Sequence, residues 1–116
     1  MSVLIVSVNY GTAPMTLQAA DAGVAAALHL GCDWSYCIVD NKSPDDSVAV
    51  LRAGMEGRRR EQRPGWERVH LLESDHNGGF GAGNNLAIRQ AFAGPSPPEY
   101  VYLLNSDAFP EAGEPQ

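Results

Sequence analysis

The chain has 116 residues, of which 44% are hydrophobic and 19% are charged, as in one small globular domain. Its formal net charge of −6 argues against general binding to nucleic acid or to an anionic membrane surface. No segment is apolar for long enough to cross a bilayer. The two cysteines, Cys32 and Cys37, form no metal-ligand pattern, so we expect a reduced, cytoplasmic protein.

The first predicted strand is residues 3–8, a short run rich in β-branched residues that is typical of a strand buried on both faces. A helix is predicted next, with Pro14 in its first turn and Gly31 closing it. Apolar residues recur along this helix at spacings of three and four, so we expect one face to be buried. They are Leu17, Ala20, Val24 and Ala27.

The second predicted strand is residues 34–39. The sequence Ser43-Pro-Asp-Asp46 predicts the start of the second helix, because serine caps helices, proline suits the first position and acids favour the positive end of the dipole. This helix is expected to run through Leu51 to about Met55. Residues 57–65 contain four arginines and predict a solvated loop or a frayed helix end, with a phosphate-binding patch as the alternative.

The third predicted strand is residues 69–73, followed by a glycine-rich turn at 75–85 and a third helix at 86–92. A stiff, proline-rich loop at 94–98 precedes the fourth strand at 100–104. Strands that alternate with helices indicate right-handed crossovers and a parallel sheet. The prediction is therefore an α/β fold of three layers, α/β/α, with a mainly parallel, Rossmann-like sheet of about four strands.

The glycine-rich turn carries four glycines between a strand and a helix. Such a turn lets the backbone approach a phosphate closely, and the helix N-terminus offers free N–H groups. The alternative is a tight turn with no ligand. The spacing fits neither a dinucleotide G-x-G-x-x-G fingerprint nor a P-loop, so a classical NAD site is disfavoured and a P-loop is excluded.

Polar residues follow every predicted strand. They are Asn9 and Tyr10, Asp40 and Asn41, the turn at 75–85, and Asn105 with Asp107. Because the carboxyl ends of parallel strands share one edge, we expect these groups to meet where α/β sheets bind ligands. Each group alone could instead only shape a turn.

Four motifs occur in an order that resembles a known family. They are Ile5-Val-Ser-Val-Asn-Tyr10, Val39-Asp-Asn-Lys-Ser-Pro-Asp45, Asn77-Gly-Gly-Phe-Gly-Ala-Gly-Asn-Asn85 and Leu103-Leu-Asn-Ser-Asp-Ala108. From Val3 to about Glu111 the chain resembles the inverting glycosyltransferases of family 2, in particular their rhamnosyltransferase-like branch. The resemblance implies the nucleotide-diphospho-sugar transferase fold. It also implies that residues 1–116 form the N-terminal, donor-binding portion, with the acceptor-binding portion and the catalytic base beyond Gln116.

The resemblance further implies a role for individual residues. Asp40 is expected on the base or ribose of the nucleotide, and Asp107 on a Mg²⁺ or Mn²⁺ ion that holds the diphosphate. Asn105 stands where the family has the first acid of an Asp-x-Asp motif. The full set of expected substrate-binding residues is Val8, Asn9, Tyr10, Asp40, Asn77, Gly78, Gly79, Asn84 and Asn105.

The function implied is transfer of a sugar from a nucleotide-diphosphate donor to a glycan or lipid-linked acceptor in polysaccharide or cell-wall biosynthesis. We expect such an enzyme in the cytoplasm or peripheral to the inner face of the membrane. The alternative is a non-catalytic nucleotide-binding or self-associating module, which would form a homo-oligomer. A nucleotidyltransferase is a weaker alternative, because residues 9–14 contain no basic side chain.

Overall fold

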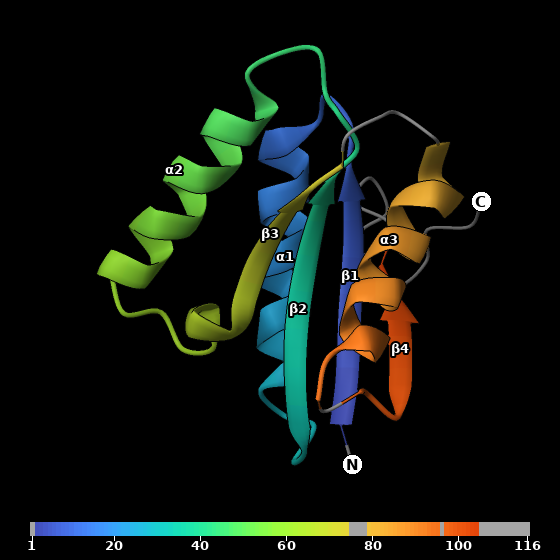
Figure 1. Ribbon diagram of the computed structural model, residues 1–116. Helices are drawn as coiled ribbons and strands as arrows, with labels where there is room; N and C mark the ends of the chain where they lie inside the picture. Colours follow the sequence, from blue (N-terminus) through green and yellow to red (C-terminus); the bar gives the residue numbers. More distant parts are fainter. Residues whose placement is uncertain (1, 75–78, 96, 105–116) are drawn as a thin grey trace, which may run out of the picture.

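The computed structural model describes residues 2–74, 79–95 and 97–104, and for residues 79–84 only the course of the backbone. Strands and helices alternate along the chain (Figure 1). The elements are β1 (Ser2–Asn9), α1 (Ala13–Ala27), β2 (Asp33–Asp40), α2 (Ser47–Arg60), the short 3-10 helix η1 (Trp66–Arg68), β3 (Val69–Glu73), α3 (Gly79–Ala93) and β4 (Tyr100–Leu103).

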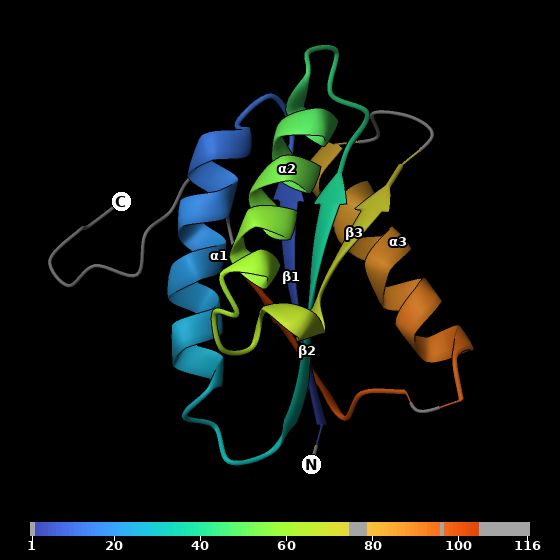
Figure 2. The same cartoon turned by 90° about the vertical axis from the view of Figure 1, so that its left-hand side faces the viewer.

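The four strands form one parallel sheet in the order β3-β2-β1-β4. The chain builds outward from β1 to β2 and β3, then returns to pair β4 with the other side of β1. Right-handed crossovers in opposite directions place their helices on opposite faces of a sheet. Accordingly, α1 and α2 cover one face and α3 covers the other (Figure 2). The predicted three-layer α/β fold is confirmed.

Side chains alternate between the two faces of the sheet, so each face has its own apolar core. Ile5 on β1 and Ile38 on β2 pack with Leu17 of α1 and Leu51 of α2. On the opposite face, a smaller cluster beneath α3 comprises Leu4, Val6, Val8, Val39 and Ala87, with Cys37 packed against it. Burial raises the pKa of the Cys37 thiol to about 11.

The arginine-rich segment departs from its prediction, because α2 continues to Arg60. Arg58 donates from two nitrogens to the carboxylate of Asp21 on α1, each at 2.8 Å, and lies 5.1 Å from the centre of the Trp66 ring. The hydrogen bond to Asp21 raises the pKa of Arg58. Arg59 donates to the main-chain oxygens of Trp66 and Val69. These two arginines join α1, α2 and η1, so the prediction was wrong for residues 57–60. Residues 61–64 form an exposed loop, as predicted.

Three helix boundaries also differ from their predictions. Helix α1 ends at Ala27, and Gly31 adopts a left-handed conformation (φ +68°) in the loop beyond it. Helix α2 begins at Ser47, with Asp46 at its N-cap, rather than at Ser43. Helix α3 begins at Gly79 rather than at residue 86, so the second half of the predicted glycine-rich turn is helical. Glycine has low helix propensity, but packing of an apolar face against a sheet readily overrides propensity.

None of the helices in the described part of the chain is both long and apolar enough to cross a membrane.

Candidate functional site

The strand order creates a switch point at the carboxyl end of β1. From β1 the chain crosses to β2 through α1 on one face of the sheet, whereas β4, on the other side of β1, is reached through α3 on the opposite face (Figure 2). Ligands of open α/β sheets bind in the crevice at such points. Asn9 ends β1 there, and Asp40 is its register partner at the end of β2.

Asn9 and Asp40 form a buried hydrogen-bonded pair. Their side chains are 0% and 2% exposed, and Asn9 Nδ2 donates to Asp40 Oδ1 at 2.9 Å. Main-chain hydrogen bonds also join the ends of β1, β2 and β3. The Asn41 N–H donates to Asn9 O at 2.8 Å, and the Ser74 N–H donates to Asp40 O at 2.9 Å. Burying polar groups is unfavourable unless they are hydrogen-bonded, and this pair meets that requirement.

Ser43 binds the Asp40 carboxylate from the other side. Its hydroxyl donates to Asp40 Oδ1 at 2.6 Å, and its main-chain N–H donates to Oδ2 at 3.0 Å. The same hydroxyl accepts a hydrogen bond from the Gly11 N–H at 2.9 Å, which joins the loops after β1 and β2. This engagement explains the late start of α2: the hydroxyl predicted to cap the helix is bound to Asp40.

Two threonines of the loop and first turn of α1 bind the other end of the Asn9 amide. Asn9 Oδ1 accepts from the hydroxyl of Thr16 at 2.6 Å and from that of Thr12 at 3.2 Å. Thr16 is fully buried. A connected chain of hydrogen bonds therefore runs from Thr16 through Asn9 to Asp40 and Ser43.

The remaining predicted residues fall in four groups. Tyr10 follows Asn9 directly and is 47% exposed, so its ring is available to a ligand. The side chain of Val8 is buried beneath α3, so any contribution to a ligand site must come from its main chain. Gly79 and Asn84 lie in the first two turns of α3. Asn77, Gly78, Asn105 and Asp107 lie outside the described residues.

The predicted metal ligand, Asp107, lies outside the described residues. Within residues 2–74, 79–95 and 97–104, no three His, Cys, Asp or Glu side chains gather closely enough to hold a metal ion. Asp45 lies near the loop after β1, with Oδ2 3.6 Å from where a Cβ on Gly11 would stand. Hydrogen bonds from Ser47 lower the pKa of Asp45, so this exposed carboxyl adds negative charge beside Gly11.

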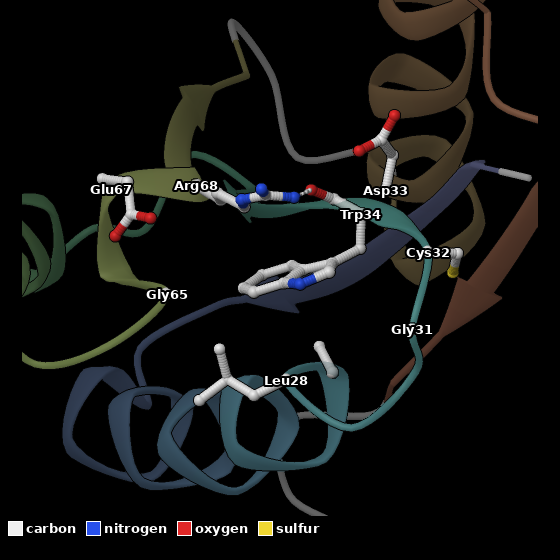
Figure 3. A pocket seen from close by; sticks show the side chains of 9 residues that line it. Leu28, Gly31, Cys32, Asp33, Trp34, Gly65, Glu67 and Arg68 are labelled. Atoms are coloured by element: carbon white, nitrogen blue, oxygen red, sulfur yellow. Dashed lines mark hydrogen bonds between the residues drawn. The ribbon is translucent and has the colours of Figure 1, made fainter.

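A cavity of about 680 Å³ lies at the opposite end of the sheet, where β2 begins (Figure 3). Arg68 lies over Trp34, 5.4 Å from the ring centre, and donates to the Trp34 main-chain oxygen at 3.3 Å. The Arg68 guanidinium group therefore already interacts with Trp34. The parallel-sheet rule favours the carboxyl ends, so we place the candidate site at Asn9 and Asp40 despite the volume of this cavity.

The sequence interpretation missed the site roles of Ser43 and Thr16. Ser43 stands three residues after Asp40, a spacing at which an acid side chain commonly binds a following main-chain N–H. Thr16 precedes Ala20 and Val24 at intervals of four, so it is a polar residue on the buried stripe of α1. Both signals were visible in the sequence, but the partner of each hydroxyl was not.

Solved structures similar to this chain share its fold. A mannosyltransferase from Pyrobaculum calidifontis, PcManGT, solved in complex with GDP-Man and Mn²⁺, is 21% identical, with a TM-score of 0.68 over 92% of this chain and 28% of its own. Residues 1–349 of TarS from S. aureus, in complex with UDP-GlcNAc, are 18% identical, with a TM-score of 0.65 over 94% of this chain and 27% of theirs. This chain thus spans less than a third of either structure.

A search of curated protein sequences found no match. A family model described as glycosyl transferase family 2, in contrast, matches residues 2–114. This match covers nearly the whole chain, and the chain shares its fold with PcManGT and TarS, which were solved in complex with GDP-Man and UDP-GlcNAc. The chain therefore belongs to glycosyl transferase family 2.

Proposed function

We propose that this chain is the donor-binding part of an enzyme that transfers a sugar from a nucleotide diphosphate to a glycan or lipid-linked acceptor. The observation that carries the proposal is the buried Asn9–Asp40 pair at the switch point of a family 2 sheet. The similar structures were solved with GDP-Man or UDP-GlcNAc, which supports a nucleotide-sugar donor. Because the chain covers 28% of PcManGT, the acceptor side and the catalytic base are expected elsewhere in such an enzyme.

Asp40 has acceptor capacity for a ligand. A carboxylate oxygen has room for about two hydrogen bonds. Among the described residues, Oδ1 accepts from Asn9 and Ser43, whereas Oδ2 accepts only from the Ser43 N–H. Asp40 is thus suited to accept from a ring N–H of uracil, thymine or guanine, or from a ribose hydroxyl. Cytosine and adenine have no such ring N–H donor on their pairing edge.

A divalent cation completes the proposal. Loss of the sugar leaves a diphosphate with growing negative charge, which Mg²⁺ or Mn²⁺ would neutralise as a Lewis acid. Such cations take oxygen ligands, and Asp107, four residues beyond the end of β4 in the sequence, would supply a carboxylate. The Mn²⁺ in the mannosyltransferase complex supports this choice. If the acceptor is lipid-linked, as in polysaccharide or cell-wall biosynthesis, the enzyme works at the inner face of the membrane.

Calorimetric titration tests the donor site. We expect UDP, dTDP or GDP to bind with Mn²⁺ present, to bind at least about tenfold more weakly without it, and to bind more tightly than CDP and ADP. Asp107→Ala should remove the Mn²⁺ dependence while the protein stays folded by circular dichroism. Absence of metal-dependent heat for all three nucleotides, in a folded sample, would contradict the proposal.

One observation favours a second candidate, a self-associating module. Strand β4 is the edge of the described sheet, and it exposes Tyr100, Tyr102 and Leu103, with Tyr102 60% exposed. Exposed apolar edge strands pair readily with other chains. Light scattering should then show an oligomer of wild type that Leu103→Lys converts to monomer. An oligomer with no nucleotide binding would favour this candidate over the transferase.

A further inference from the structure

The Asn9 side chain is fully engaged inside the protein. Nδ2 donates to Asp40 Oδ1 at 2.9 Å and to Ser43 Oγ at 3.4 Å, while Oδ1 accepts from Thr16 and Thr12. A primary amide has two N–H donors and two acceptor lone pairs, so every one of them is used. With 0% of its surface exposed, Asn9 has no polar side-chain atom left for a ligand.

The orientation of the Asn9 amide follows from the chemistry of its neighbours. Asp40 accepts every hydrogen bond it makes among the described residues, so only the NH₂ end of Asn9 can face it. The oxygen end must then face α1, where the hydroxyl of Thr16 donates to it at 2.6 Å. Thr16 makes the shorter of the two threonine contacts and is itself fully buried, so a ligand cannot reach it.

Resting on the proposed role of Asp40 in donor binding, we propose that Thr16 is a positioning residue for the nucleotide. Thr16 fixes the Asn9 amide, Asn9 holds Oδ1 of Asp40, and the carboxylate keeps the acceptor capacity of Oδ2 for the ligand. Asn9 was predicted to contact the substrate. In this proposal the Asn9 side chain instead acts indirectly, by holding Asp40 in place. Preorganisation of this kind tightens binding because the carboxylate need not be ordered when the ligand arrives.

Thr16→Val tests this role, because valine keeps the shape of threonine and removes only the hydroxyl. The probe is whichever of UDP, dTDP and GDP the wild type binds most tightly, titrated with Mn²⁺. We expect Thr16→Val to weaken its binding about tenfold, as for the loss of one hydrogen bond that orients a charged group. Thr16→Ser keeps the hydroxyl and should bind within about twofold of wild type.

Ser7→Ala is the matched control. Ser7 lies on β1 two residues before Asn9, and its buried hydroxyl is 2.6 Å from the Tyr36 hydroxyl, outside the Asp40 chain of hydrogen bonds. Its removal should lower the midpoint of thermal unfolding about as much as Thr16→Val does, with unchanged nucleotide affinity. A structural role alone would therefore move stability in both variants and affinity in neither.

A double variant separates positioning from a general effect on the fold. In an Asp40→Asn background, measured by NMR titration because binding is weak, Thr16→Val should cause no further loss. Wild-type affinity in Thr16→Val, failure of Thr16→Ser to restore binding, or a full additional loss in the double variant would each overturn the positioning role alone. If the wild type binds none of the three nucleotides, the proposed function fails, and the positioning role fails with it.

Discussion

Polar side chains are buried at one end of the central strands, β1 and β2, and exposed at the other. At the carboxyl ends, Asn9, Asp40 and Thr16 are buried and hydrogen-bonded to one another. At the amino end of β2, Asp33, Glu67 and Arg68 are exposed around a cavity of about 680 Å³. Exposed charges are inexpensive to keep, whereas buried polar groups are unfavourable unless each finds a partner. The buried network therefore says more about function than the cavity at the amino end of β2 does.

The largest expected effect comes from Asp40→Asn at the carboxyl end. The new amide would bring N–H donors towards the Asn9 NH₂ and Ser43, so we expect unfolding free energy to fall by about 2–3 kcal/mol. We expect nucleotide affinity to fall about a hundredfold, because the acceptor for the ligand is disturbed as well. Urea unfolding and calorimetry measure the two effects. Retained affinity with lowered stability would remove Asp40 from the ligand site and weaken the contrast between the two ends.

An intermediate effect is expected from alkaline pH, which probes the buried centre of the sheet between those ends. Burial raises the pKa of Tyr36 to about 12, although its hydrogen bond with Ser7 partly offsets this rise. Burial also raises the pKa of Cys37, to about 11. In the unfolded chain the pKa values are the ordinary ones, about 10 for tyrosine and 9 for cysteine, so the unfolded chain loses these protons first as pH rises. The stability that the two protonated groups contribute is therefore fully present below about pH 9 and is lost as pH rises above it.

Between pH 10 and 11 each group should remove about 1 kcal/mol of unfolding free energy. Urea unfolding at pH 9, 10 and 11 checks the slope. Tyr36→Phe has no titrating hydroxyl and should lose about half as much stability over the interval as wild type. An equal loss in both proteins would show that Tyr36 is more accessible to solvent than its 0% exposure indicates.

The smallest effect is expected from Arg68→Gln at the amino end of β2. The change removes the contact over the Trp34 ring and one long hydrogen bond, both near solvent. We expect unfolding free energy to fall by about 0.5–1 kcal/mol and nucleotide affinity to stay unchanged. A clear loss of nucleotide binding would mean that the cavity at the amino end takes part in function and that the two ends of the sheet do not differ in this way.

Much of the fold could be predicted from periodicity. The apolar runs at residues 3–8, 34–39 and 69–73 all became strands, and the four apolar residues of the first helix are all buried. The errors lie at helix boundaries, where local signals compete. Ser43 carries a strong capping signal, yet its hydroxyl binds Asp40 and Gly11 and the helix starts four residues later. Arg58 was predicted to be solvated because its partner, Asp21, is remote in sequence.

For the candidate site, the sequence alone determined which residues follow each strand and, through four motifs, the family that the match over residues 2–114 confirms. It placed Asn9, Tyr10 and Asp40 at strand ends, and the structure brings these together. Asn77, Gly78, Asn105 and Asp107 stay predictions. Only the tertiary structure decided that β4 returns to the far side of β1 and that Thr16 reaches Asn9. Strand order and side-chain partners depend on contacts between distant segments, which local periodicity does not encode.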